Sequence, residues 1–178
     1  MAGVTVVKKS LSCAETAKLV RGALKAAFPG QKFSVRSSTY AGGASIRVSW
    51  IDGPTQPEVD AVVKQFEGAT FDGMIDLKDY KPATLLANED GTYEERSYGA
   101  DWVQTDRRYS EAVEEAAKLE IVGIVGAGLP FDYNGRYDVA VDRETGELIA
   151  CTGQIVSETY GSTILHRYLY RRDLRERP

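Results

Sequence analysis

Apolar residues recur every three to four positions after Ser12, and this spacing predicts an amphipathic helix that ends at 29–30, a Pro-Gly pair. Ser12 followed three residues later by Glu15 indicates a capping box, in which each side chain accepts a hydrogen bond from a backbone N–H at the helix start. The apolar stripe comprises Ala17, Val20, Ala23, Leu24, Ala27 and Phe28. The opposite face of this helix should be open to solvent.

Two segments that alternate between apolar and polar residues follow, at 32–37 and 45–51. Alternation places every second side chain of a strand on the same face, so both segments are predicted to be strands. The glycine-containing segment 39–44 joins them as a hairpin. The side chains expected to point inward are Phe33, Val35, Ile46, Val48 and Trp50.

A second helix is expected after the turn at 52–54, with Thr55 as its N-cap and Glu58 completing another capping box. Its apolar face comprises Val59, Val62, Val63 and Phe66. Gly68 should end this helix. The following stretch, 71–82, contains turn residues without a clear period and predicts an ordered loop.

The rest of the chain continues to alternate between helical and strand periods. The pattern predicts one or two strands in 92–108, a helix at about 110–125 that stops at 126–130, and strands at 137–141, 148–156 and 162–170, with a turn at 144–147. Strands that follow one another through short turns favour antiparallel pairing. We therefore predict an α+β fold in a single domain over residues 1–178, with a mostly antiparallel sheet and about three helices packed on it.

The composition is that of a globular chain: of its 178 residues, 43% are hydrophobic, enough for a core. No stretch approaches the ~18 consecutive apolar residues of a membrane span, and Lys8 and Lys9 near the start have no apolar run behind them. We therefore expect a cytoplasmic protein with no membrane partner. Cys13 and Cys151 are too few for a zinc site and are interpreted as buried or incidental thiols.

The net charge of -4 conceals an uneven distribution along the chain. Residues 1–51 carry eight basic side chains and one acidic one, whereas residues 52–120 carry seven basic and seventeen acidic ones. If the fold keeps these segments apart, the surface is dipolar and would orient the protein on an anionic partner. If the fold interleaves them, the two charges cancel locally.

Residues suited to catalysis are sparse. The single histidine, His166, lies in a predicted strand, and no serine or cysteine occupies a nucleophile motif that would need it as a base. The glycine-rich segments 41–44 and 123–128 lack the lysine and the strand–loop–helix order of a phosphate-binding loop. We therefore predict no catalytic residue and no cofactor.

Three aspartates, Asp72, Asp76 and Asp79, are spaced so that they would gather on one side of a turn and hold a divalent metal. A solvated acidic loop explains the same spacing. Met74 also stands where the twelve-residue calcium loop has an acidic or amide ligand. We predict no metal site here, and a small metal-dependent enzyme acting on nucleic acid is kept as an alternative.

Basic and hydroxyl side chains gather on the predicted solvent faces of the first helix and the hairpin. Cations for phosphates, hydroxyls for hydrogen bonds and an aromatic ring at a hairpin tip are the groups used in sequence-tolerant nucleic-acid binding. Exposed faces also need charges for solubility, so the pattern by itself permits either interpretation. The candidate residues for binding nucleic acid or a partner are Lys18, Arg21, Lys25, Lys32, Arg36, Tyr40 and Arg47.

Several strings of residues in order along the chain carry a family resemblance. The strings 15–21, 28–30, 33–38, 48–55 and 66–74 resemble the large polyvalent protein-associated domain that is twenty-ninth in its series. The resemblance covers residues 12–110, and the remainder is predicted to be an antiparallel extension of the same fold. It implies a setting in phages, plasmids and conjugative elements and a part in element transfer or in countering host defence, and it brings no catalytic residues.

The leading hypothesis is a non-enzymatic binding protein of a mobile genetic element. It would act as a counter-defence inhibitor of the anti-CRISPR or anti-restriction type, by occupying a surface of a host defence protein, a nucleoprotein complex or nucleic acid itself. The alternatives are the metal-dependent enzyme and a structural component of a phage particle.

Overall fold

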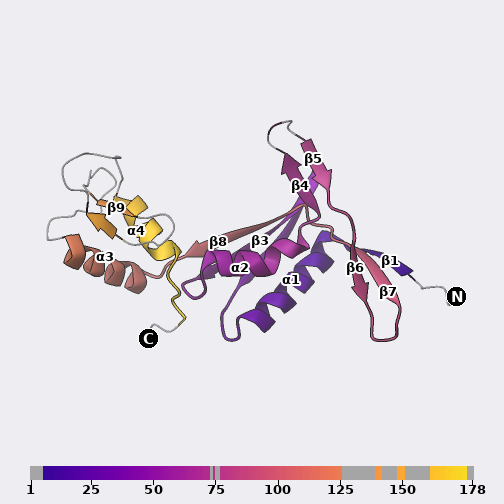
Figure 1. Ribbon diagram of the computed structural model, residues 1–178, viewed down its shortest axis with the longest axis horizontal. Coiled ribbons are helices and arrows are strands. Elements are labelled where there is room, and N and C mark those ends of the chain that lie inside the picture. Colours follow the sequence, from indigo (N-terminus) through magenta and orange to yellow (C-terminus); the bar gives the residue numbers. More distant parts are fainter. Residues whose placement is uncertain are drawn as a thin grey trace. The chain divides into compact units, whose positions relative to one another are not determined.

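The computed structural model describes residues 6–72, 74, 77–125, 139–141, 148–150 and 161–175, and it confirms the predicted α+β class (Figure 1). The helices in these ranges are α1 (Cys13–Ala27), α2 (Gln56–Val63), which continues as a 3-10 turn over Lys64–Phe66, α3 (Glu111–Val125) and α4 (Gly161–Tyr170). The strands are β1 (Val6–Ser10), β2 (Ser34–Tyr40), β3 (Gly43–Ile51), β4 (Ala69–Asp72), β5 (Leu77–Tyr80), β6 (Thr84–Ala87), β7 (Tyr93–Ser97), β8 (Trp102–Arg108), β9 (Val139–Val141) and β10 (Leu148–Ala150).

The chain divides into two compact units, which are described separately. The first unit comprises Met1–Trp50 and Pro57–Asp106, and the second comprises Ile51–Gln56 and Arg107–Pro178. Compact units of one chain can still unfold together. The single domain expected for residues 1–178 therefore stays a prediction.

None of the described helices is long and apolar enough to cross a membrane.

The core of the first unit lies between the sheet β2-β3-β8 and the helices α1 and α2, which cover one face of it (Figure 1). Val35 on β2 lies opposite Val48 on β3, and both are buried, as predicted. The other buried core residues of this unit include Ala17, Val20, Leu24, Phe28, Ile46, Trp50, Val59, Val63 and Val103. Burial of this apolar face holds the hairpin on the two helices.

The first helix begins as its sequence predicts. The Ser12 side chain accepts a hydrogen bond from the Glu15 backbone N–H, and the Glu15 carboxylate accepts one from the Ser12 N–H at 2.9 Å. Because these bonds favour the charged carboxylate, the Ser12 backbone and hydroxyl groups lower the pKa of Glu15. The predicted capping box is confirmed.

The capping box gives a pH-dependent contribution to stability. A carboxyl whose pKa is lowered by folding stabilises the protein above its unfolded pKa, about 4.3, and this contribution is lost as the pH falls through the folded pKa. We expect Glu15→Gln to remove this part of the acid sensitivity. Urea unfolding of both proteins between about pH 3 and pH 7 checks this, and curves that stay parallel over the range would contradict it.

The smaller sheets of the first unit show what the sequence analysis missed. The sheet β1-β7-β6 contains a parallel pair, β1 with β7, besides the antiparallel pair β6 with β7. The ordered loop predicted for 71–82 is wrong, because β4 and β5 pair there as an antiparallel hairpin. Phe71, Leu77 and Tyr80 are exposed on its two faces. Because apolar residues lie on both faces of these four-residue strands, the sequence lacks the apolar–polar alternation that would predict a strand.

In the second unit, α3 is confirmed, and β9 and β10 form the predicted antiparallel pair. The strand predicted for 162–170 is wrong, because α4 occupies Gly161–Tyr170. Leu165, Tyr168 and Leu169 are buried while His166 is exposed, which is a helical spacing of three and four. A run this rich in apolar residues fits both periods. The predicted helix stop at 126–130, the turn at 144–147 and residues 137–138 and 151–156 lie outside the described residues.

Candidate nucleic-acid interface

The outer face of the β2–β3 hairpin, opposite to α1 and α2, carries paired arginines and serines. The register places Arg36 directly opposite Arg47, between the pairs Ser34–Ser49 and Ser38–Ser45. Residues directly opposite each other on antiparallel strands project from the same face. We call this set the hairpin face: Ser34, Arg36, Ser38, Ser45, Arg47 and Ser49.

The two arginines of the hairpin face lie directly opposite each other on the paired strands, and within the described chain neither is paired with a carboxylate. Arg36 and Arg47 are both exposed, and neither makes an ion pair with any acidic side chain of the described chain. Like charges directly opposite on paired strands are destabilising. An anion placed between them removes that repulsion, because each guanidinium offers donors in the geometry that phosphate oxygens accept.

The hairpin turns at Ala41–Gly42, where Gly42 has a φ of 90°, in the left-handed region that favours glycine. Tyr40 lies beside this turn, opposite Gly43, and is 52% exposed. A Cβ at Gly43 would come within 3.1 Å of the Tyr40 ring and 2.4 Å of the Asp101 carboxylate. The ring is therefore held over a position that has no side chain. An exposed aromatic ring of this kind is a surface on which a nucleic-acid base can stack.

Asp101, which the sequence analysis did not select, fixes the start of β3. Its carboxylate accepts a hydrogen bond from the Ala44 N–H at 2.8 Å, and its own backbone N–H donates to the Ala44 carbonyl at 2.8 Å. The Lys78 ammonium lies 2.8 Å from the same carboxylate, and this bond raises the pKa of Lys78. The bonds to Lys78 and to the β3 backbone engage this carboxylate within the fold.

The basic residues of α1 do not join the hairpin face. Lys18, Arg21 and Lys25 are exposed on α1, and α1 covers the inner face of the sheet. Arg21 reaches the edge of the sheet, where its Nη2 donates to the Val35 carbonyl at 2.8 Å. The sequence-predicted site is thus two separate basic surfaces. Lys32 is exposed just before β2 and is in phase with Ser34 and Arg36.

The other chemical candidates of the sequence take no part in this face. Asp79 is exposed on β5, the placement of Asp76 lies outside the described residues, and no group of three metal-ligating side chains forms within the described part. Cys13 is buried under the hairpin, with its Sγ 3.6 Å from the Ser45 carbonyl, and burial raises the pKa of this thiol.

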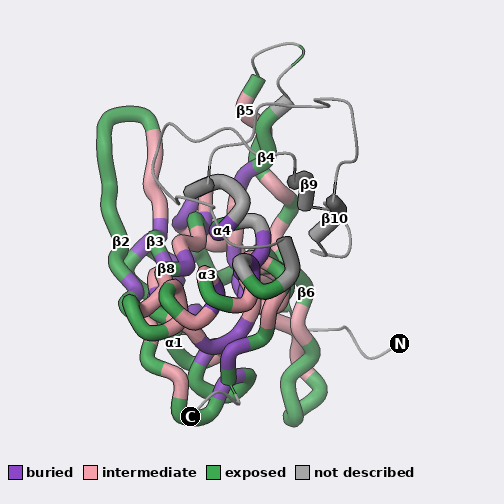
Figure 2. Tube along the Cα trace, turned by 90° about the vertical axis from the view of Figure 1, so that its left-hand side faces the viewer, coloured by how far each residue is buried: buried purple, intermediate pink, exposed green. Residues whose placement is uncertain are grey.

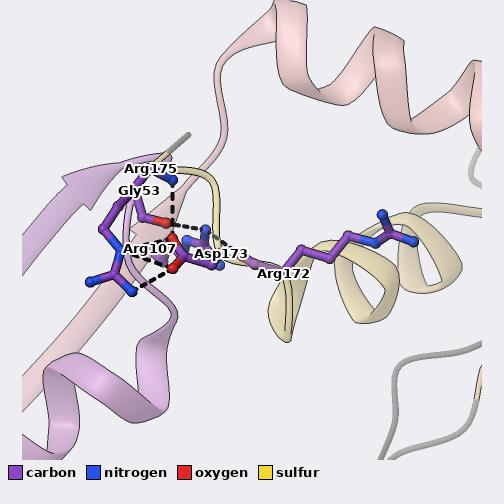
Figure 3. Close-up of polar contacts among 5 residues, drawn as sticks. All are labelled: Gly53, Arg107, Arg172, Asp173 and Arg175. Carbon is purple, nitrogen blue, oxygen red and sulfur yellow. Dashed lines mark hydrogen bonds and ion pairs between the residues drawn. The ribbon is translucent and has the colours of Figure 1, made fainter. Parts of the chain in front are cut away.

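In the second unit, the buried side chain of Arg107 donates hydrogen bonds to backbone carbonyls of separate segments. It is 6% exposed and donates to the carbonyls of Asp52 at 3.1 Å, Gly53 at 2.7 Å and Arg172 at 2.8 Å, as Figure 3 shows for the last two. It also donates to two carbonyls at the end of α4, those of Leu169 and Tyr170. Burial lowers the pKa of Arg107. All three nitrogens of the guanidinium donate to carbonyls inside the fold, so this site is structural.

His166 is exposed on α4, with its ring between those of Tyr109 and Tyr170 at centroid distances of 6.2 and 6.3 Å. The ring packs on aromatic neighbours, and none of these contacts places it beside a serine or cysteine nucleophile.

The fold and the hairpin face define a small α+β protein with an exposed cationic surface. The chain belongs to the family described as large polyvalent protein associated domain 29, whose sequence model matches residues 11–110. This confirms the resemblance found in the sequence, and the family fits a protein of a mobile genetic element. No curated protein and no solved structure matches the chain.

Proposed function

We propose that this chain is a non-enzymatic binding protein of a mobile genetic element and that the hairpin face contacts the phosphate backbone of nucleic acid. In this proposal it acts as a counter-defence inhibitor, of the anti-CRISPR or anti-restriction type, on a host nucleoprotein complex. Of the components of that complex, the nucleic acid would be the first that the hairpin face contacts.

The observation that carries the proposal is the pairing of Arg36 with Arg47. Two exposed like charges in direct opposition cost stability, and the fold provides no described carboxylate to offset them. The flanking serines add hydroxyl donors, and Tyr40 adds an aromatic surface at the hairpin turn. Arginine contacts to phosphates and stacking on Tyr40 do not depend on base identity, so binding through them would tolerate many sequences.

Reversing both charges of the hairpin face tests this proposal. We expect Arg36→Glu with Arg47→Glu to weaken binding to a fluorescent 20-nucleotide strand at least tenfold, about 1.4 kcal/mol. The slope of log affinity against log salt should fall by roughly 1.4, about 0.7 for each lost phosphate contact on a single strand. Fluorescence anisotropy between about 50 and 200 mM salt measures both quantities.

A matched control separates local contact from overall charge. Lys18→Glu with Lys25→Glu changes the net charge by the same amount on the other side of the sheet, so it should affect binding much less. Equal losses in the two double variants would show that only net charge matters, and unchanged binding in the hairpin variant would remove the hairpin face from the proposal. Affinity capture from host lysate with and without nuclease then distinguishes bare nucleic acid from a nucleoprotein complex.

A further inference from the structure

Strand β2 is an edge strand of the sheet β2-β3-β8, and most of its residues are exposed (Figure 2). An edge strand presents a row of backbone N–H and C=O groups that can pair with another chain. The hydrogen bonds of β3 identify the backbone groups of β2 that point outward.

On β3, the Ala44 carbonyl accepts from the Asp101 backbone N–H and the Ala44 N–H donates to the Asp101 carboxylate, so the backbone groups of Ala44 face away from β2. Because backbone direction alternates along a strand, Ser45, Arg47 and Ser49 must bond to β2. Their partners Ser38, Arg36 and Ser34 then face β3. The groups of Val35, Ser37 and Thr39 therefore point outward.

A separate contact supports this assignment of the outward groups. The Val35 carbonyl accepts its bond from Arg21 on α1, at 2.8 Å. Within the described chain, no hydrogen bond reaches the outward backbone groups of Ser37 or Thr39. The centre of the β2 edge is open.

The opposite edge of the sheet is closed by side chains. On β8, the Val103 N–H donates to the Glu67 carboxylate at 3.0 Å, and the Val103 carbonyl accepts from the Lys64 ammonium at 2.8 Å. Both side chains come from the segment after α2. The fold therefore blocks strand addition at β8 and permits it at β2.

A groove of about 360 Å³ lies at the start of the β2 edge. Its apolar lining includes Leu24, Phe28 and Phe33, and Arg21 and Lys25 also line it. A groove of this kind accepts an apolar side chain from a segment whose charges are negative. It is continuous with the open edge through Val35, which lines the groove and belongs to β2.

We propose that the β2 edge binds an extended acidic segment of a partner protein as an added strand, with one large apolar side chain in this groove. A second copy of this chain would fit poorly, because pairing two β2 edges brings Arg21 and Lys25 of both copies together. An acidic segment meets the same cations with opposite charge. This surface is distinct from the hairpin face, and the inference does not rest on nucleic-acid binding.

Ser37→Pro tests the edge directly, because proline removes an outward N–H and leaves the bonds to β3 intact. Ser37→Thr is the matched control, since it keeps the N–H. The probe is a displayed library of random ten-residue peptides, selected on the wild-type protein. We expect enrichment of peptides with several acidic residues and one aromatic or large aliphatic residue.

The enriched peptides should bind Ser37→Pro at least tenfold more weakly than Ser37→Thr, with both variants folded by circular dichroism. Methylation of alternate backbone nitrogens in the peptide should cause a similar loss. Binding that is equal in the two variants, enrichment of basic peptides or no enrichment would overturn the proposal. So would self-association of the wild-type protein that Ser37→Pro abolishes, because the occupant would then be a second copy. Arg36→Glu with Arg47→Glu separates this result from the nucleic-acid proposal, since it leaves the edge N–H groups in place.

Discussion

Arg107→Leu should unfold the second unit or destabilise it by roughly 3–5 kcal/mol, because its guanidinium is the hydrogen-bond donor to five backbone carbonyls. A leucine side chain has similar bulk and no donor. A buried carbonyl that loses its donor has already given up its hydrogen bonds to water, and no bond within the protein replaces them. The cation also lies at the carboxyl end of α4, where the helix dipole favours positive charge.

The contacts of Arg107 tie the turn at 52–53 to the end of α4 and to Arg172, and Figure 3 shows those to Gly53 and Arg172. The backbone pairing of Gly53 with Leu174 lies in the same place, with the Leu174 N–H donating to the Gly53 carbonyl at 3.0 Å. Loss of the arginine should therefore release the C-terminal segment first. Hydrogen exchange read by mass spectrometry would show faster exchange in 161–175 than in α1.

Two variants calibrate this result. Arg107→Lys keeps the charge but offers fewer donors in a different geometry, so it should restore only part of the stability. Arg108→Leu changes the exposed next residue of β8 and should cost less than about 1 kcal/mol. Urea denaturation measures all three. A melt of Arg107→Leu that matches the wild type would show that water replaces the guanidinium at these carbonyls.

Gly99→Ala should destabilise the first unit by about 3 kcal/mol or prevent its folding. A Cβ at this position would stand 2.2 Å from the Leu11 carbonyl oxygen and 2.7–2.8 Å from backbone atoms of Ser12 and Cys13. These are backbone atoms at the start of α1, which cannot move aside as a flexible side chain does. Overpacking against such atoms forces the backbone apart, at typical costs of 1–3 kcal/mol and sometimes more.

The close approach at Gly99 positions the start of α1. The Gly99 N–H donates to the Thr16 hydroxyl at 3.1 Å, and that hydroxyl donates to the Ser12 carbonyl at 2.9 Å. The Leu11 N–H also donates to the Ser97 carbonyl at 3.0 Å. A methyl group at 99 would break this set of bonds as well as the packing.

Gly22→Ala is the matched control, because the same methyl group is added in the middle of α1 where nothing lies within 4 Å. Alanine is a better helix former than glycine, so this variant should gain up to about 1 kcal/mol. Thermal and urea unfolding measure both variants. Equal shifts of the two in the same direction would contradict the steric explanation.

The candidate site shows how far a single sequence can predict a surface. The alternation in 32–37 and 45–51 and the short turn between them were enough to place Arg36 and Arg47 on one face, because register in a hairpin is set locally. The sequence did not separate this face from the α1 residues. That separation depends on which side of the sheet the helix covers, which is decided by burial of Val20 and Leu24 against β2, β3 and β8.

The sequence by itself determined the capped first helix, the hairpin, the third helix and the family. The three elements depend on contacts between neighbours in the chain, such as Ser12 with Glu15, and the family rests on the order of residues along the chain. Only the tertiary structure decided the roles of Asp101 and Arg107, since the backbone groups to which they bond lie more than 50 residues away in sequence. It also decided that 161–170 is a helix. Its apolar residues fit either period, and packing of Leu165 and Leu169 in the second unit selects the helical one.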